Sequence, residues 1–471
     1  MKVGLFAKKS IDTLLQEAES TNSQGLTRSL NVFNLTALGV GAIIGAGIFV
    51  LTGQVAANYA GPAIALSFIL AAFGCVFVGL CYAEFASIIP IAGSAYTYAY
   101  TTLGELVAWI IGWDLVLEYL FTASTVAVGW SGYVVSLLND LGITIPEALL
   151  SESLNLPAMF IVLLMTGILM IGIRKSAGFN NVIVAVKVGV ILLFIFLGIA
   201  YINDQNWIPF IPKNTGEFGA FGWSGIWRGT GVIFFAYIGF DAVASAAQEA
   251  QNPQKDMPIA ILSSLVISTV LYVSVALVLT GLVPYQQLNV PDPIAVGVNA
   301  LGEALQWLRP IIKLGAIAGL SSVILVLLMA QSRIVYALAN DGLLPPQLAS
   351  VHPQFRTPHR ATIISGIIAT LFAGLLPMNL LSELVSIGTL LVFLIISIAV
   401  LVLRQTQPDL PRPFRTPLVP WVPILGALVS GVQMLAFSFD TWLRLVGWLL
   451  MGLLIYFAYG RKNSAVNLRA D

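Results

Sequence analysis

Long apolar stretches alternate with short polar connections along almost the whole chain. A helix that crosses a bilayer needs about 20 apolar residues, and twelve stretches of the chain meet this requirement. The stretch from Pro408 to Pro423 is rich in proline, which cannot continue a helix, so it is predicted to be a linker before the last two helices. The twelve predicted membrane helices centre near Gly45, Gly74, Tyr119, Leu164, Val190, Ile238, Val270, Leu325, Ala369, Phe393, Leu428 and Leu450.

Two of these stretches carry glycines near their middle. The first contains GAIIGAGIF, from Gly41 to Phe49, and the second contains FFAYIGFDA, from Phe234 to Ala242. Five predicted helices begin with the first stretch, and five more begin with the second. Two glycine-interrupted membrane helices at matching places in two halves are the best sequence indication of a transporter's binding site. Unwound backbone inside a membrane needs polar partners, which a bound ligand and its coupling ion can supply.

Close helix packing is the alternative explanation for these glycines. Gly41 and Gly45 form a G-x-x-x-G pattern, which is typical of helices that pack closely in membranes. The first stretch, however, has four glycines within nine residues, from Gly39 to Gly47, and the second interrupted stretch matches it in position. Together these features favour an unwound helix that forms a binding site.

The composition excludes a soluble protein. Of the 471 residues, 58% are hydrophobic and only 9% are charged, whereas soluble domains carry about 25% charged residues. The net charge is zero, which predicts no nucleic-acid partner. Cys75 and Cys81 lie in an apolar stretch and are expected to be buried thiols, so no metal site is predicted. No nucleotide-binding or hydrolytic motif is present, so the chain is predicted not to be an enzyme.

The placement of lysine and arginine predicts the orientation in the membrane. If the N-terminus is cytoplasmic, 16 of the 22 basic residues fall on the cytoplasmic side. Both termini are therefore expected in the cytoplasm, and the compact loops indicate a plasma membrane, namely a bacterial inner membrane. Residues 10–20 carry apolar side chains on one helical face, which fits either an amphipathic helix on the membrane surface or a solvated tail helix.

The predicted breaks suit a ligand that carries both charges. A helix that begins inside the membrane presents free N–H groups and a positive dipole end, which favour a carboxylate. A helix that ends there presents free carbonyls, which favour an ammonium group. An α-amino acid carries both groups and is the predicted substrate. The predicted carboxylate donors are the N–H groups of Gly45, Ala46 and Gly47, and the predicted amino-group acceptors are carbonyls near Ile43, Phe235, Ala236 and Ile238.

Lys187 lies deep in the fifth predicted helix. A charged side chain in the middle of a membrane is costly, and it indicates a functional site by default. Burial can lower a lysine pKa from about 10.4 by 3–5 units, which would let it gain and lose a proton. A fixed cation bonded to helix-end carbonyls is the alternative. We favour proton coupling, because a structural cation would more often lie near an interface.

Four other side chains near the breaks are candidates for a role at the site. Glu118 is expected either to line the substrate cavity or to be a buried neutral acid bonded to a hydroxyl or amide. Asp114, one turn earlier, is expected close enough to the interface to be solvated. Asp241 is expected as a charge at the N-terminus of a half-helix. Phe235 precedes the second break and is predicted to be a gate over the ligand, with an ordinary core aromatic as the alternative.

Several motifs resemble the amino acid–polyamine–organocation superfamily, and within it the cationic amino acid transporter family and its bacterial relatives. They include GLTRSLNVFNLTALGVGAIIGAGIFVLTG (Gly25 to Gly53), FFAYIGFDAVASAAQEAQNPQKDMP (Phe234 to Pro258) and RPFRTPLVPWVPILG (Arg412 to Gly426). The resemblance implies an all-α polytopic membrane fold of twelve helices, with a five-plus-five inverted repeat, broken helices 1 and 6 and two further helices. It implies secondary transport of amino acids by alternating access.

This resemblance also divides the chain and suggests the coupling ion. The expected parts are a cytoplasmic N-terminal segment (1–30), a first repeat (31–203), a second repeat (204–405) and a linker with the last two helices and a cytoplasmic tail (406–471). Lys187 matches the family's lysine on the fifth helix, which stands where sodium-coupled relatives bind sodium. Protons are therefore the expected coupling ion, with no other cofactor.

The sequence says less about which amino acid side chain the substrate carries. Ala46 stands where relatives often have a small hydroxyl residue, and Leu325 in the eighth helix is expected to fill space near the substrate side chain. Small neutral amino acids are the predicted substrates, taken up by proton symport. Amino acid exchange, cationic amino acid transport and a membrane amino acid sensor are the alternatives. The expected partners are the substrate, protons and membrane lipids, and a small membrane protein or a sterol-like lipid on the outer helices is left open.

Overall fold

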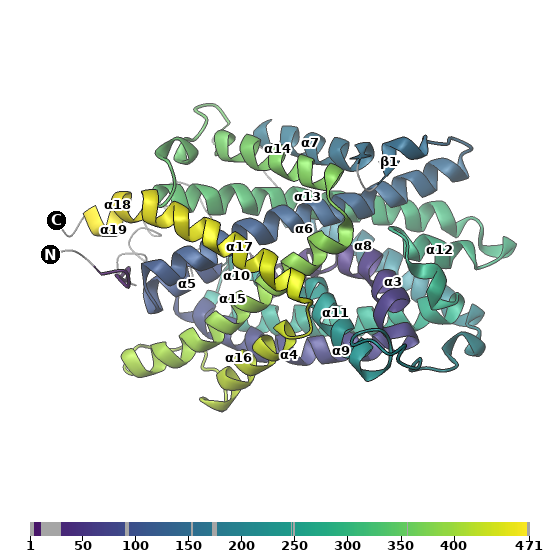
Figure 1. Cartoon of the computed structure of the whole chain (residues 1–471), viewed down its shortest axis with the longest axis horizontal. Coiled ribbons are helices and arrows are strands. Elements are labelled where there is room, and N and C mark those ends of the chain that lie inside the picture. The colour runs from purple at the N-terminus through teal and green to yellow at the C-terminus, as the bar shows by residue number, and fades with distance from the viewer. Residues whose placement is uncertain are drawn as a thin grey trace.

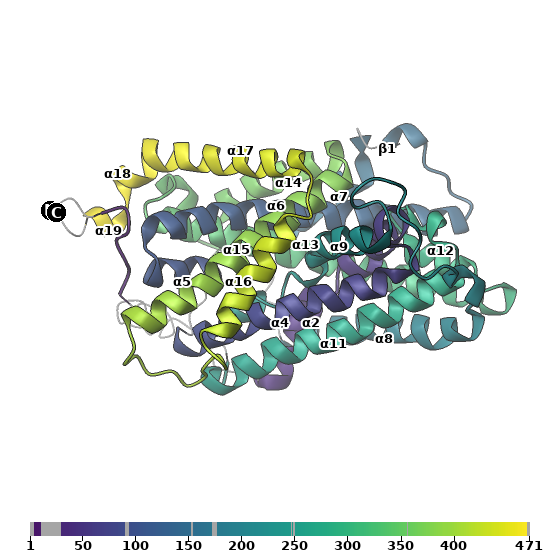
Figure 2. The ribbon, with the colours of Figure 1, turned by 60° about the horizontal axis from the view of Figure 1, so that its bottom comes forward.

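The computed structural model describes residues 4–10, 30–89, 94–151, 154–171, 177–245, 247, 250–355 and 357–468. Within them the chain forms an elongated bundle whose long helices run roughly along its longest axis (Figures 1 and 2). Most of the predicted surface helix at 10–20 lies outside the described residues.

The first half of the bundle begins with a helix that changes its form repeatedly. Its elements are α2 (Val32–Ile43), the π-helix η1 (Gly47–Leu51), α3 (Thr52–Val55), the π-helix η2 (Ala56–Ala60), η3 (Gly61–Ala63), α4 (Ile64–Ile88), α5 (Ser94–Thr102), α6 (Glu105–Asp140), η4 (Glu147–Leu149), β1 (Leu150–Ser151), β2 (Leu154–Asn155), α7 (Leu156–Ile171), α8 (Ala177–Gly198), η5 (Ile199–Tyr201) and η6 (Asp204–Trp207). Strands β1 and β2 form a short antiparallel pair in which Leu150 faces Asn155.

The second half begins with the other interrupted helix. Its elements are α9 (Gly222–Ile233), the 3₁₀ turn η7 (Phe234–Tyr237), α10 (Ala242–Ser245), α11 (Pro253–Leu282), η9 (Tyr285–Leu288), α12 (Pro293–Asn299), η10 (Glu303–Leu305), α13 (Leu308–Asn340), η11 (Pro346–Ala349), α14 (His359–Leu375) and α15 (Met378–Thr406). A linker leads to α16 (Trp421–Met434), α17 (Phe439–Ile455), η12 (Tyr456–Gly460), α18 (Arg461–Asn463) and α19 (Ala465–Leu468).

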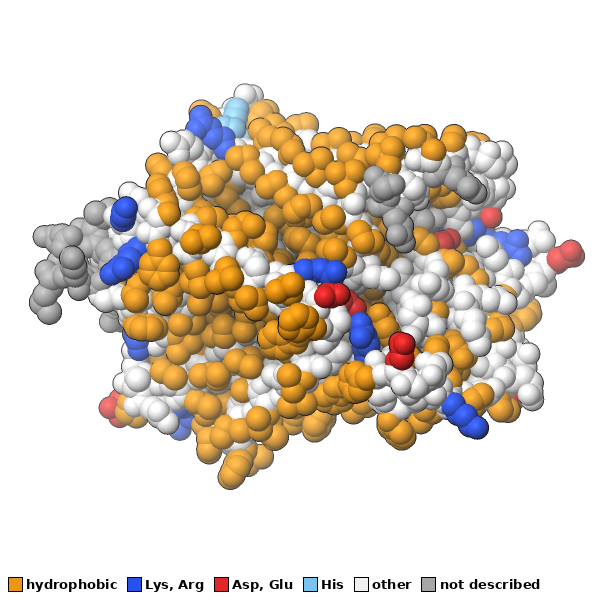
Figure 3. Space-filling model, in the orientation of Figure 1, with side chains coloured by type: hydrophobic (Ala, Val, Ile, Leu, Met, Phe, Trp, Pro, Cys, Tyr) orange, Lys and Arg blue, Asp and Glu red, His pale blue; other side chains and the backbone are white. Residues whose placement is uncertain are grey.

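The predicted polytopic, all-helical membrane fold is confirmed. Seven helical runs among the described residues are long and apolar enough to cross a membrane, and the first of them, Val32–Ile88, contains two of the predicted helices. Helices α7, α14 and α16 are shorter apolar helices, and α9 with η7 and α10 forms the second interrupted segment. Hydrophobic side chains cover most of the face seen in Figure 3, as expected of a surface in contact with lipid.

The two interrupted segments lie against each other and run in opposite directions. A Cβ atom built on Gly39 would lie 2.8 Å from Val243, and one built on Gly229 would lie 3.0 Å from Val55. Gly47 contacts Ala236 between these two pairs. Residue numbers therefore rise along one segment as they fall along the other, which is the antiparallel relation that an inverted repeat requires.

Residues near both termini meet at one end of the bundle (Figure 1). The Lys9 ammonium lies 2.5 Å from a carboxylate oxygen of Asp341, which follows α13. The Ala465 N–H donates to the Asp341 carbonyl at 2.9 Å. The two ends of the chain are thus on the same side of the bundle, as an even number of crossings requires, and the cytoplasmic location of that side stays a prediction.

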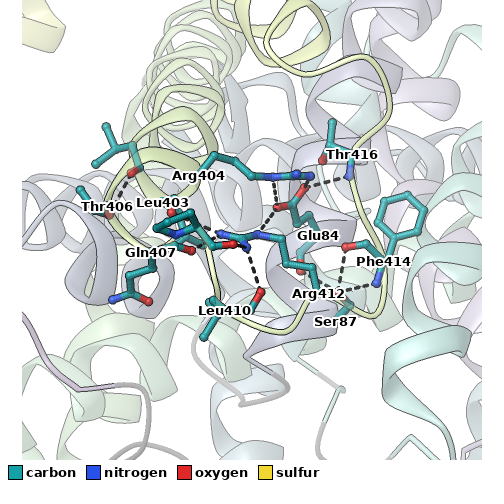
Figure 4. Close-up of polar contacts among 12 residues, drawn as sticks. Glu84, Ser87, Leu403, Arg404, Thr406, Gln407, Leu410, Arg412, Phe414 and Thr416 are labelled. Carbon is teal, nitrogen blue, oxygen red and sulfur yellow. Dashed lines mark hydrogen bonds and ion pairs between the residues drawn. The ribbon is translucent and has the colours of Figure 1, made fainter.

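A buried carboxylate fastens the linker that follows α15 (Figure 4). Glu84, near the end of α4, is only 1% exposed. Arg404 donates to both of its oxygens at 2.8 Å, and Arg412 lies 3.3 Å from one of them. The Thr416 N–H also donates to Glu84 at 2.8 Å. One side chain of the first half therefore binds the end of α15 and two points of the linker between α15 and α16.

We expect Glu84→Ala to lower the free energy of unfolding by about 3 kcal/mol, because removing one partner of a buried ion pair leaves the other charge uncompensated. Denaturation in detergent, followed by circular dichroism, measures this change. Glu303→Ala is the control, since Glu303 is exposed. Equal stability of the two variants would contradict the assigned role of Glu84.

Candidate functional site

The first interruption lies at Ile44 and Gly45. Helix α2 ends at Ile43, Ile44 is extended with φ −71° and ψ 96°, and helical backbone resumes at Ala46. The last carbonyls of α2 and the first N–H groups after the break lack partners within their own helices. The break lies where the glycine pattern predicts it. It brings free acceptors and free donors within a few residues of each other.

The second interruption follows the 3₁₀ turn η7. Ile238 is extended with φ −57° and ψ 132°, and Gly239 has φ +119°. A Cβ atom on Gly239 would also lie 2.7 Å from the carbonyl carbon of Ala42. Glycine is required here by both the backbone angle and the close approach of the two segments. The Asp241 carboxylate accepts a hydrogen bond from the Gly239 N–H at 3.1 Å, and α10 begins at the next residue.

A cavity lies between the two breaks and is bounded by α2, α6, α8 and α13. Seven of the residues predicted for the site line it: Ile43, Gly45, Ala46, Gly47, Lys187, Phe235 and Ile238. Phe235 is only 4% exposed, which fits a gate and a core aromatic equally, so its role as a gate stays a prediction. No group of three or more His, Cys, Asp or Glu side chains able to hold a metal ion occurs in the described part of the chain.

Lys187 reaches the first break from α8. Its ammonium donates to the carbonyls of Gly41 at 3.1 Å and Ile44 at 3.3 Å, and its side chain is only 2% exposed. These two carbonyls belong to the end of α2, where the negative end of the helix dipole lies. The lysine therefore satisfies backbone acceptors that the break leaves open.

Tyr272 connects the two breaks from α11. Its hydroxyl lies 2.7 Å from the Ile43 carbonyl and 2.9 Å from the Ala236 carbonyl, and its side chain is fully buried. A hydroxyl has one proton, so it donates to one carbonyl at a time. Each carbonyl has a second lone pair, which leaves it able to accept from a ligand as well. The sequence offers no signal for this role, because Tyr272 is a single tyrosine in an apolar stretch.

Comparison with known families shows what kind of protein carries this site. The profile described as amino acid permease matches residues 30–458. The chain belongs to the amino acid permease family. The membership in the amino acid–polyamine–organocation superfamily, predicted from the motifs, is thereby confirmed. The permease is a multi-pass membrane transporter of amino acids and not an enzyme.

Individual relatives match the permease over most of its length. It is 48% identical over 470 residues to the methylthioribose transporter of Bacillus subtilis (strain 168), covering 98% of this chain and 99% of that protein. It is 46% identical over 477 residues to the branched-chain amino acid permease BcaP of the same organism, covering 99% and 100%. The cationic amino acid transporter 4, vacuolar, of Arabidopsis thaliana is 37% identical over 414 residues, covering 86% and 68%.

Three residues predicted for the site of the permease do not line the cavity. Ala236 contributes its backbone to the contact with Gly47 instead. Leu325 is not among the residues that line the cavity, whereas its neighbours Val323, Val326 and Leu327 are. The expectation that Leu325 fills space beside the substrate stays a prediction.

Glu118 is also outside the cavity wall. Tyr119, Thr122 and Val126 present the lining face of α6, and Glu118 points toward α15, where the Thr389 hydroxyl donates to it at 2.9 Å. Of its two expected placements, the structure has the one with a hydroxyl partner. Asp114 is fully buried, so the expectation that it is solvated is wrong.

The wall opposite the breaks offers mainly apolar surface. Val126, Val323 and Val326 contribute methyl groups. The hydroxyls of Thr122 and Ser322 donate to carbonyls of their own helices, at 2.5 Å and 2.8 Å. The polar groups of the cavity therefore gather at the breaks, and the far wall suits an apolar side chain. Sequence periodicity could have identified this wall, once one lining residue on each helix was known.

We expect Tyr272→Phe to lower the free energy of unfolding by about 1–3 kcal/mol, because a buried carbonyl loses its donor. The measurement is denaturation of the purified permease in detergent. Tyr201→Phe removes a hydroxyl from a side chain that is 43% exposed and is the control. If both variants unfold like the wild type, the bridge does not hold the two breaks together.

Proposed function

We propose that the permease takes up neutral amino acids with apolar side chains by proton symport with alternating access. The observation that carries this proposal is the contact of the Lys187 ammonium with the Gly41 and Ile44 carbonyls at the first break. A titratable group that satisfies the backbone of the binding site can couple its own protonation to the shape of that site.

The substrate assignment rests on the chemistry of the breaks. The N–H groups of Gly45, Ala46 and Gly47 follow the break and suit a carboxylate. The carbonyls near Ile43, Phe235, Ala236 and Ile238 suit an ammonium group, and each retains or shares an acceptor site there. This arrangement favours a zwitterion over a ligand without charge.

The side-chain preference rests on the far wall and on the relatives. The valines of α6 and α13 form an apolar surface, and the one acid that lines the cavity among the described residues, Asp241, lies at the second break and not on that wall. A relative of 46% identity is named a branched-chain amino acid permease. Branched aliphatic amino acids are accordingly the proposed substrates, a narrower class than small neutral amino acids.

Lys187 is proposed as the coupling group. When charged, it bonds to the end of α2 and stabilises the broken conformation. When it loses its proton, this electrostatic attraction is lost and α2 is free to move relative to α8. Protonation from one side of the membrane and release to the other would thereby accompany the movement of substrate. Protons are the only coupling ion proposed, and no other cofactor is needed.

The proposed placement in the cell follows from the family and the charges. The first repeat (31–203) and the second (204–405) would rock against each other around the breaks. The bacterial relatives support a bacterial inner membrane, and the distribution of basic residues supports cytoplasmic termini. Membrane lipids would surround the outer helices.

Uptake of a methylthio sugar is a second candidate function, favoured by the 48% identity to a methylthioribose transporter. Such a ligand has a thioether that would suit the apolar wall, but it has neither a carboxylate nor an ammonium group for the breaks. Competition separates the candidates. Excess methylthioribose would abolish leucine uptake if the sugar shares the cavity with comparable affinity.

The deciding experiment is uptake of radiolabelled leucine into liposomes that contain the purified permease, with and without an inward proton gradient. Accumulation that requires the gradient is expected. Uptake that occurs only after preloading with unlabelled amino acid would instead identify an exchanger. Binding without any flux across a panel of amino acids would identify a sensor.

We expect Lys187→Met to reduce gradient-driven leucine uptake to the level of protein-free liposomes, because the proposed coupling group can no longer take up a proton. Lys255→Met removes an exposed lysine and should leave uptake unchanged. Uptake by Lys187→Met that still responds fully to the gradient would refute the coupling role.

We expect Val326→Ala to raise the ratio of phenylalanine to valine uptake about tenfold, since removing methyl groups from a pocket wall changes discrimination by about 1–3 kcal/mol. Competition uptake assays measure this ratio. Leu325→Ala is the matched control on the same helix, and it should leave the ratio unchanged because Leu325 is not part of the cavity lining. An effect of Leu325→Ala alone would refute the assigned wall.

A further inference from the structure

A second buried polar cluster lies on α6, behind the cavity wall. Asp114 and Glu118 stand one helical turn apart, and their side chains are 0% and 2% exposed. Both face α15, where a Cβ atom built on Gly388 would lie 2.8 Å from an Asp114 oxygen. The hydroxyl of the next residue, Thr389, donates to Glu118 at 2.9 Å. The two acids are therefore enclosed between α6 and α15.

These acids have few partners. Neither oxygen of Asp114 has a hydrogen-bond partner, and one oxygen of Glu118 has none. Among the ion pairs of the described residues, none includes either side chain. Other buried acids differ: Glu84 binds two arginines, and Glu383 lies 3.1 Å from Arg228.

Unpartnered hydroxyls gather at the same place. Tyr82 of α4 and Tyr98 of α5 are fully buried, and neither hydroxyl has a partner. Tyr82 interacts electrostatically with Glu118 and Asp241, and its ring lies 6.3 Å from that of Tyr98. Among the described residues, the titratable groups that interact electrostatically with Glu118 are Asp241 and Tyr82 from neighbouring elements and Asp114 and Tyr119 from its own helix.

All these neighbours are acidic or neutral. An ionised carboxylate in a dry interior without a cation is far less stable than the protonated acid. Aspartate and glutamate side chains within membrane helices mark proton relays in pumps and transporters. The enclosed state of Asp114 and Glu118 therefore favours the protonated form, and opening the contact between α6 and α15 would favour release.

We propose that Asp114 and Glu118 form a second proton-binding site of the permease, which loads when α15 closes on α6 and empties when the two helices separate. A proton from water converts the Asp114 carboxylate to the neutral acid, and the same O–H bond breaks when water reaches the opened cluster. This inference rests on the proposed proton symport. The inference adds to that proposal a coupled proton at a site away from Lys187, at the contact between α6 of the first half and α15 of the second half.

The test compares Asp114→Asn with wild type in proteoliposomes. With one pH unit across the membrane, each coupled proton supports about a tenfold accumulation. The variant, which cannot bind this proton, should lower gradient-driven leucine accumulation about tenfold. Exchange of leucine with equal pH on both sides needs no net proton movement, so it should stay within about twofold of wild type. Asp440→Asn, an exposed acid-to-amide change, should alter neither.

The outcomes separate the two proposals. If wild type accumulates leucine with the gradient and Asp114→Asn does so equally, the second site is refuted while the symport proposal stands. If wild type shows no gradient-driven accumulation, both fall. Loss of exchange and accumulation together in Asp114→Asn would indicate a structural role for Asp114 and would also refute the proposal.

An infrared measurement is independent of transport. The carbonyl stretching band of a protonated carboxyl group should be present in the wild-type protein at neutral pH, and Asp114→Asn should lack one such component. Glu118→Gln should lose a different one. Identical bands in wild type and both variants would overturn the assignment of protons to this pair.

Discussion

Everything at the centre of this bundle depends on the rule that backbone polar groups in a membrane must find partners. Two helices stop and restart there, and each stop exposes carbonyls and N–H groups to a region without bulk water. Lys187 satisfies carbonyls of the first segment, and Tyr272 joins one carbonyl of each segment. We propose the substrate as the partner of the remaining groups.

Small residues make this arrangement possible. Gly47 and Gly239 let the backbones of the two interrupted segments approach so closely that a methyl group at either position would collide with the other segment. The cavity lies between the two breaks. The apolar walls of α6 and α13 then complete it from outside the pair.

Much of this architecture could be predicted from the sequence. The length of the apolar stretches predicts the membrane helices, and the position of the glycines predicts the two breaks. Each of the twelve predicted helix centres falls on a described helix or on one of the two breaks. Lys187 was identifiable since a lysine is conspicuous in an apolar helix. The errors concern rotation and depth. The lining of the cavity includes Val323 and Val326 but not the predicted Leu325, and Asp114 is fully buried, deeper than a position near a helix end suggests. Such errors are inherent, because a helix apolar all round gives no phase to its pattern.

The Glu84 cluster has a consequence for the order in which the protein is made. The carboxylate lies on the second predicted membrane helix, but its arginine partner Arg404 is 320 residues further along the chain. While the intervening helices are inserted, this acid has no partner and must stay hydrated or hold a proton. The tip of α4 becomes a fixed part of the bundle only when the linker arrives. Biogenesis of this chain therefore includes a locking step, in which a late segment neutralises a charge laid down near the beginning.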